Sequence, residues 1–167
     1  MNKGILLVLS GYLMWGCFPL YWALLNHVNP SEVLIHRMLW AVPVLFFLVH
    51  FKSSWKNNFK DSISSKKELV FLFITAILIT INWGGYIYAV NLGRVVEASM
   101  GYFLSPVINM IGGYIFFQER ISKLKQLAVF LATVGALYYV FSGDSFPWLG
   151  FLVGFTFSAY GIARKAM

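Results

Sequence analysis

The chain has 167 residues, of which 59% are hydrophobic and only 11% are charged. This composition excludes an ordinary soluble domain and favours an all-α integral membrane protein. The net charge of +7 could suggest nucleic acid, but the basic residues lie in short connectors between apolar runs rather than on one polar face. We therefore expect the lipid bilayer as a partner and no nucleic acid.

Six apolar segments follow one another, each near the roughly 20 residues that a membrane-spanning helix needs. In chain order they cover about residues 4–25, 31–50, 69–90, 97–117, 124–142 and 147–163. The first is too long for the apolar region of a signal peptide, and no small-residue cleavage site follows it. We expect it to be a retained helix, which gives about six transmembrane helices.

Basic residues are distributed unequally between alternate connectors. Of the 13 Lys and Arg residues, Arg37 lies inside a predicted span and Arg94 lies in a connector on one side. The other basic residues all fall on the opposite side, five of them between residues 52 and 67. By the positive-inside rule this predicts a multi-pass protein of the cytoplasmic membrane, with both termini in the cytoplasm.

The second segment carries ionisable residues close to its outer end. Arg37 either extends along the helix to reach water or points inward, where it would line a cavity or pair with an acid. Glu32 and His36 form the only acid and imidazole pair at helical spacing. No metal-ligand spacing, phosphate-binding loop or nucleophile motif accompanies them, so we expect no enzyme, no cofactor and no metal. Pro43 is expected to bend this helix, because proline removes a backbone hydrogen bond.

Polar side chains interrupt the third segment and the start of the fourth. Asn82 and Tyr86 share a face of the third segment, with Trp83 beside them. Asn82 is expected either to make an interhelical hydrogen bond or to face a solute path. Glu97 at the start of the fourth segment either caps that helix or pairs with Arg37. Tyr86 could instead belong to an aromatic belt at the membrane surface.

The fourth segment combines small, polar and proline residues near the middle of the bilayer. Ser105, Asn109 and Gly113 recur every four residues and predict a face for close helix contact. Pro106 interrupts the helical hydrogen bonds next to this face. Interrupted helices near the bilayer middle are common at transport sites, although packing also tolerates them.

A weak internal repeat relates the two ends of the chain. Residues 7–16 (LVLSGYLMWG) align with residues 152–161 (LVGFTFSAYG). The second copy lies five predicted helices after the first, so it enters the membrane from the opposite side. Inverted repeats of this kind are typical of secondary transporters.

These residues carry a resemblance to a known family. The sequence resembles the first half of a RarD-type permease of the EamA group, in the drug/metabolite transporter superfamily. The resemblance covers essentially the whole chain, and these motifs carry it: Gly11-Tyr12, Trp15-Gly16, Glu32-Val33-Leu34-Ile35-His36-Arg37, Asn82-Trp83, Ala89-Val90-Asn91, Glu97-Ala98-Ser99, Gly101-Tyr102-Phe103, Ser105-Pro106, Glu119-Arg120 and Tyr160-Gly161 to Arg164-Lys165.

The resemblance implies ten helices in two inverted five-helix repeats. Residues 1–142 would then be one complete repeat, and residues 143–167 the first helix of a truncated second repeat. We expect a secondary transporter of a small metabolite or drug-like solute, with a second chain or the missing C-terminal half completing the path. The alternative is a truncated or split membrane protein without independent transport. The candidate residues of the solute path are Trp15, Arg37, Asn82, Trp83, Tyr86, Glu97, Tyr102 and Asn109, with Pro43 and Pro106 as points of helix bending.

Overall fold

The computed structural model describes residues 3–51, 65–143 and 145–167. Each predicted apolar segment forms one helix within these residues, and the predicted ends are correct to within about three residues. The chain is therefore an all-α membrane protein, as the composition predicts. The helices are α1 (Lys3–Leu24), α2 (Pro30–Phe51), α4 (Lys66–Asn91), α5 (Val95–Phe117), α6 (Lys123–Ser142) and α7 (Trp148–Ala166).

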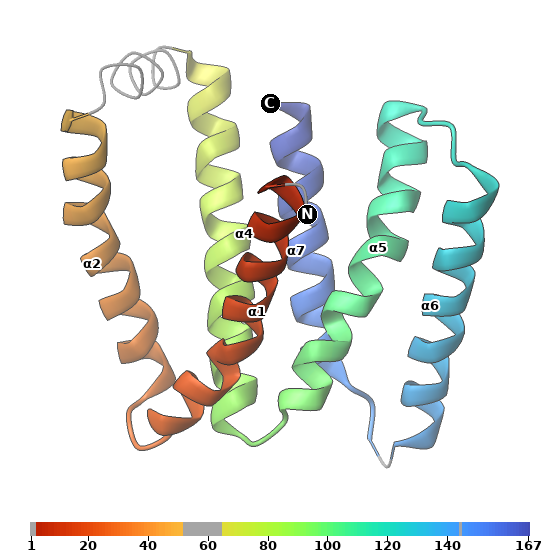
Figure 1. Ribbon diagram of the computed structural model, residues 1–167, viewed down its shortest axis with the longest axis horizontal. Coiled ribbons are helices and arrows are strands. Elements are labelled where there is room, and N and C mark those ends of the chain that lie inside the picture. The colour runs from red at the N-terminus through yellow and green to blue at the C-terminus, as the bar shows by residue number, and fades with distance from the viewer. Residues whose placement is uncertain (1–2, 52–64, 144) are drawn as a thin grey trace.

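Successive helices run in opposite directions, and both ends of the chain lie toward the same end of the bundle (Figure 1). The basic connector predicted at residues 52–67 lies largely outside the described residues.

Two prolines lie inside helices that continue past them, Pro43 in α2 and Pro106 in α5. Neither proline ends its helix, because the surrounding turns keep their own hydrogen bonds.

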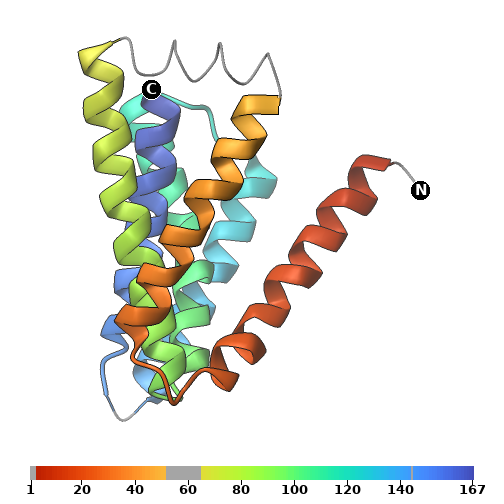
Figure 2. The ribbon, with the colours of Figure 1, turned by 90° about the vertical axis from the view of Figure 1, so that its left-hand side faces the viewer.

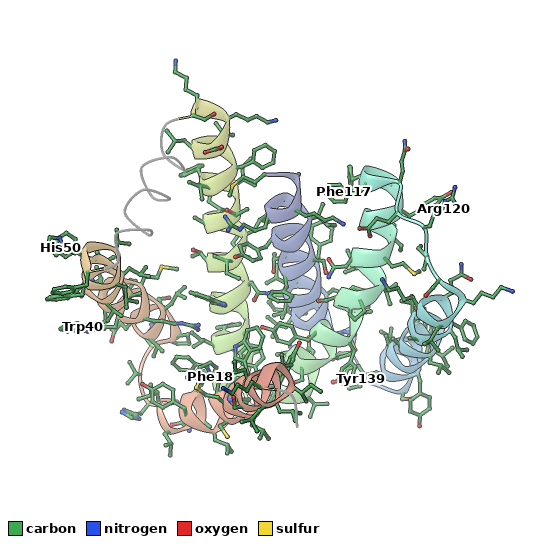
Figure 3. The ribbon with its side chains drawn as sticks, turned by 45° about the horizontal axis from the view of Figure 1, so that its top comes forward. Phe18, Trp40, His50, Phe117, Arg120 and Tyr139 are labelled. Carbon is green, nitrogen blue, oxygen red and sulfur yellow. The ribbon has the colours of Figure 1, made fainter. Side chains whose placement is uncertain are left out.

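Five of the described helices, all except α7, are long and apolar enough to cross a membrane. Their outward faces carry large apolar side chains, such as Trp40, which is 70% exposed. Figure 3 shows Trp40 and His50 on the side of α2 that faces away from α4. An exposed apolar surface of this extent fits contact with lipid.

Helix α7 lies in the middle of the bundle, between α4 and α5 (Figure 1). It is rich in small and hydroxyl residues, and Leu149, Val153 and Ser158 on it are fully enclosed. Small residues allow helix backbones to approach closely where lipid supplies little driving force for association. The position of α7 therefore depends on close contacts with its two neighbours.

The closest helix crossing joins α5 to α7 through three glycines. A methyl group added at Gly101 would lie 2.3 Å from the carbonyl oxygen of Gly150, and one added at Gly154 would lie 2.5 Å from the carbonyl oxygen of Gly101. Next to them the Ser105 hydroxyl donates to the carbonyl of Gly154 at 3.4 Å, and the Ser158 hydroxyl to that of Ser105 at 3.4 Å. Of the face predicted at Ser105, Asn109 and Gly113, Ser105 thus makes the close helix contact, whereas the space at Gly113 is occupied by the Glu119 side chain.

Glu97 fixes the start of α7 rather than the start of its own helix. The carboxylate is only 4% exposed and accepts the backbone N–H of Leu149 at 2.8 Å. Pro147, at the N-cap of α7, has no side-chain acceptor, so Glu97 supplies one from α5. Arg94 balances the charge at 2.6 Å. Pairing with Arg37, one of the two roles that the sequence leaves open for Glu97, is not found, because both carboxylate oxygens already have other partners.

Helices α1 and α2 contact the rest of the bundle mainly at one end. Trp22, Val33, Ile87 and Val90 form an apolar cluster there, which we call the floor cluster. Away from this cluster α1 leans outward toward its N-terminal end (Figure 2). The bundle thus has a packed unit of α4, α5 and α7, with α6 packed on α5 and with α1 and α2 diverging from the unit (Figures 1 and 2).

An ion pair ties the far end of α7 to the end of α5. Lys165 on α7 contacts Glu119, which lies just after α5. The hydrogen bond and the charge of Lys165 hold the pKa of Glu119 below its usual range. A lowered pKa means that the pair stabilises the fold above the unfolded-state pKa of Glu119 and loses this effect as the pH falls through the folded-state value. Both side chains are about half exposed, so solvent weakens the effect.

The glycine crossing gives a prediction for stability. Gly101→Ala is expected to lower the free energy of unfolding by about 1–3 kcal/mol, because the new methyl group must push α7 away from α5. Gly135→Ala on α6 is the matched control, since nothing lies within 4 Å of a methyl group there. It should be neutral or stabilising by about 0.5–1 kcal/mol. Unfolding in mixed micelles measures both, and equal effects would contradict the close crossing.

Candidate solute-binding cavity

A cavity of about 570 Å³ lies between five of the helices. Its volume is in the range of small-molecule binding sites, roughly 300–1,000 Å³. The floor cluster closes the cavity at one end. Trp22 belongs to both the cluster and the cavity wall, and two further wall residues, Phe18 and Tyr86, pack against the cluster. The cavity is lined by Tyr12, Trp15, Gly16, Phe18, Pro19, Trp22, Arg37, Trp83, Tyr86, Ser99, Tyr102, Ser105, Pro106, Asn109 and Phe157.

Helical spacing explains how α1 and α5 contribute to this wall. On α1 the lining residues include Tyr12, Trp15, Pro19 and Trp22, which recur at three or four positions and so share one face. On α5 the polar members Ser99, Tyr102, Ser105 and Asn109 recur in the same way. One helix therefore supplies an aromatic wall, and the other supplies hydroxyl and amide groups.

Arg37 is the only charged residue among those lining the cavity. Its guanidinium carbon lies 3.7 Å from the ring centre of Trp83 and 5.6 Å from that of Trp22. Contact with two indole rings stabilises a cation that is partly removed from water. The sequence leaves two positions open for Arg37, and the structure shows the inward one, against the cavity. No acidic side chain among the described residues forms an ion pair with it.

The aromatic rings of the cavity contact one another across helices. Tyr102 lies 5.8 Å from Tyr86 and 5.3 Å from Phe157, measured between ring centres. Trp15 reaches Phe157 at 6.5 Å. Edge-to-face and tilted pairs of this kind hold rings in defined orientations. The walls from α1, α4, α5 and α7 are therefore joined by ring contacts around the open space.

Asn82 lies behind the cavity wall and is fully buried. Its side-chain amide donates to the carbonyl of Val153 at 2.7 Å and to the Thr156 hydroxyl at 3.2 Å, and its carbonyl accepts the Tyr102 hydroxyl at 3.4 Å. Asn82 thus makes the interhelical hydrogen bond that was one of its two expected roles. It also holds Tyr102, whose ring lines the cavity.

The structure brings most of the sequence-predicted candidates together around one space. Those that line the cavity are Trp15, Arg37, Trp83, Tyr86, Tyr102 and Asn109. Asn82 supports the wall from behind, and Glu97 lies outside the lining, at the start of α7. Pro106 also lines the cavity, whereas Pro43 does not.

Several lining residues are absent from the set that the sequence predicts. Tyr12, Pro19 and Trp22 could have been found from their spacing on the first helix, because they share the face of Trp15. Phe157 gives no such signal. It reaches the cavity only because α7 packs between α4 and α5, and that position depends on contacts far apart in the sequence.

Comparisons with known proteins agree on one family. The model of the EamA-like transporter family matches residues 2–141. The chain is 36% identical to the uncharacterized transporter YojE of Bacillus subtilis over 166 residues, which cover 98% of this chain and 56% of YojE. It is 36% identical to protein RarD of Escherichia coli over 164 residues, covering 98% of this chain and 55% of that protein.

A more distant relative is the chloramphenicol-sensitive protein RarD of Pseudomonas aeruginosa, with 29% identity over 169 residues, 99% of this chain and 56% of the relative. The chain thus spans about half the length of the curated relatives that it matches. No solved structure matches it.

The role of Asn82 can be tested by its replacement with an apolar residue of similar size. Asn82→Leu is expected to lower the free energy of unfolding by about 1–3 kcal/mol, because it removes the buried hydrogen bonds from α4 to α7 and leaves the Tyr102 hydroxyl without its acceptor. Thr133→Val on α6 is the control, since the Thr133 hydroxyl bonds only within its own helix, to Val129 at 2.8 Å. Chemical denaturation of the two variants measures the difference, and similar small losses would contradict an interhelical role.

Proposed function

Because the chain belongs to the EamA-like transporter family, we propose that its cavity is the solute-binding part of a secondary transporter. The transporter moves a small metabolite or drug-like solute across the cytoplasmic membrane. One observation carries this proposal: a cavity of about 570 Å³, lined from five helices and containing Arg37, lies within a bundle of membrane-spanning segments. An ionisable residue at such a position is costly in a membrane and is usually functional.

The cavity wall supports solute binding in two ways. The rings of Trp15, Tyr102 and Phe157 supply apolar and stacking surface, and Ser99 and Asn109 supply neutral hydrogen-bonding groups. A mostly apolar wall with few polar groups is typical of small-molecule sites. The described residues contain no cluster of His, Cys, Asp and Glu that could hold a metal ion, and the proposal invokes no metal.

We further propose that this chain supplies the first half of the transport unit. Residues 1–142 form one five-helix repeat, and residues 143–167 begin an inverted second repeat. The support is the match to about half the length of the relatives and the divergence of α2 (Figure 1) and α1 (Figure 2) from the packed helices. In this arrangement both termini lie in the cytoplasm, as the basic residues predict.

The second candidate function is a membrane protein without transport of its own. The exposure of α1 favours this candidate, because Trp22 is the only buried residue of that helix. The 167-residue chain therefore encloses the cavity incompletely on the side of α1. A second chain or a C-terminal half would complete the wall. The two candidates differ in what the 167-residue chain does alone, which can be measured directly.

The test compares three proteins in liposomes loaded with a bacterial extract of small metabolites. They are the 167-residue chain, the same chain fused to the unmatched remainder of Bacillus subtilis YojE, and full-length YojE as a reference. Mass spectrometry of the released solutes measures flux. We expect selective release by the fused protein and none above empty liposomes by the 167-residue chain.

Each other outcome of this test removes one part of the proposal. Release by the 167-residue chain alone would contradict its role as half of a unit. Release by YojE but not by the fused protein would contradict the assignment of a working solute site to this chain. Chloramphenicol is included among the loaded solutes because of the name of the Pseudomonas aeruginosa relative.

A further inference from the structure

The charge of Arg37 has no counterpart among the described residues. Two carboxylates at the ends of α5 are already paired, Glu97 with Arg94 and Glu119 with Lys165. No described acidic residue lines the cavity. A partly buried cation in a membrane protein is costly unless an opposite charge or water accompanies it. The cavity therefore has an excess of one positive charge when it is empty.

The position of Arg37 leaves its donors available. Its guanidinium carbon lies over the rings of Trp83 and Trp22, and these contacts use none of its N–H groups as hydrogen bonds to oxygen acceptors. The N–H groups of a guanidinium point outward in its plane and form a fork that fits a carboxylate or phosphate group. The described residues make no hydrogen bond to Arg37 that would use this fork. The two indole rings thus hold a group that can bind an anion at the wall of the cavity.

The remainder of the wall is suited to a ring or another apolar body. Tyr102 and Phe157 meet at 5.3 Å, and Trp15 lies against Phe157. The hydroxyl and amide groups of Ser99, Ser105 and Asn109 are neutral, so they neither balance the charge of Arg37 nor attract a cation. A cationic solute would meet repulsion from Arg37 and find no carboxylate.

We infer that the solute is an organic anion with an aromatic or other apolar body, whose acidic group pairs with Arg37. This inference rests on the proposed function and adds the chemical class of the solute. The acidic group accepts from the guanidinium fork, while the apolar body lies among Trp15, Tyr102 and Phe157. Charge and apolar contact act together, so a solute with only one of them binds more weakly.

Small probes that differ in one property test this inference. Phenylacetate carries both a ring and a negative charge, phenylacetamide has the ring without the charge, acetate has the charge without the ring, and phenethylamine has the opposite charge. Calorimetric titration of the purified chain in nanodiscs of phosphatidylcholine measures each affinity. We expect phenylacetate to bind at least about tenfold more tightly than the other three, because a charge-assisted pair is worth about a factor of ten or more.

Substitutions at Arg37 test whether this residue causes the preference for a negatively charged probe. Arg37→Gln should remove the preference for phenylacetate over phenylacetamide. Arg120→Gln is the matched control, because Arg120 is exposed in the connector after α5, and it should leave all affinities unchanged. Arg37→Lys retains the charge and should retain a weaker preference, which keeps the test valid even if Arg37→Gln fails to fold.

Several outcomes would overturn the inference. These are equal binding of phenylacetate and phenylacetamide, no binding of phenylacetate, or a preference that persists in Arg37→Gln. Tight binding of phosphatidylglycerol in place of phenylacetate, seen as loss of the calorimetric signal in nanodiscs containing that lipid, would assign the site to a lipid headgroup and also overturn it. Solute release by the fused protein with no preference for anions would leave the proposed function intact and remove this inference alone.

Discussion

The close crossing of α5 and α7 is the contact on which the rest of the structure depends. Gly101, Gly150 and Gly154 bring the two backbones together so closely that no side chain fits between them. In lipid, helix association relies on such close packing and on interhelical hydrogen bonds, because the surrounding solvent is as apolar as the helices. Ser105 and Ser158 supply hydrogen bonds next to the crossing, and Asn82 joins α4 to α7 by another.

The position of α7 in turn determines the cavity. With α7 between α4 and α5, Phe157 meets Tyr102, and Asn82 reaches Val153 and holds the Tyr102 hydroxyl. Glu97 holds the N-terminal end of α7 by accepting the backbone N–H of Leu149. The packed unit of α4, α5 and α7 is thus a fixed wall, whereas α1 and α2 bring Trp15 and Arg37 to it from helices that are mostly exposed. A cavity with a packed wall on one side and mostly exposed helices on the other suits a site in which α1 and α2 move relative to α4, α5 and α7.

The sequence predicts some of these features well for a physical reason. A bilayer imposes a length and an apolar composition on every spanning helix, so six helices could be placed to within a few residues. It also makes charges costly, which is why Arg37 stands out within an apolar segment of the sequence. The partner of Glu97 could not be predicted, because it is a backbone N–H 52 residues away that comes into reach only after α7 has packed. The glycines at 150 and 154 were a readable sign of that packing, and their spacing is typical of close helix contacts.

A solvent-accessible cavity beside a packed wall of α4, α5 and α7 underlies the proposed solute binding. Thiol labelling of two variants, each with Cys17→Ser, tests it most directly. Ser99 lines the cavity, whereas Ser158 is fully buried at the contact of α7 with α5. We expect a small charged methanethiosulfonate reagent to modify Ser99→Cys in the folded protein and to leave Ser158→Cys unmodified. Equal reaction at both positions, or reaction at Ser158→Cys alone, would contradict the account.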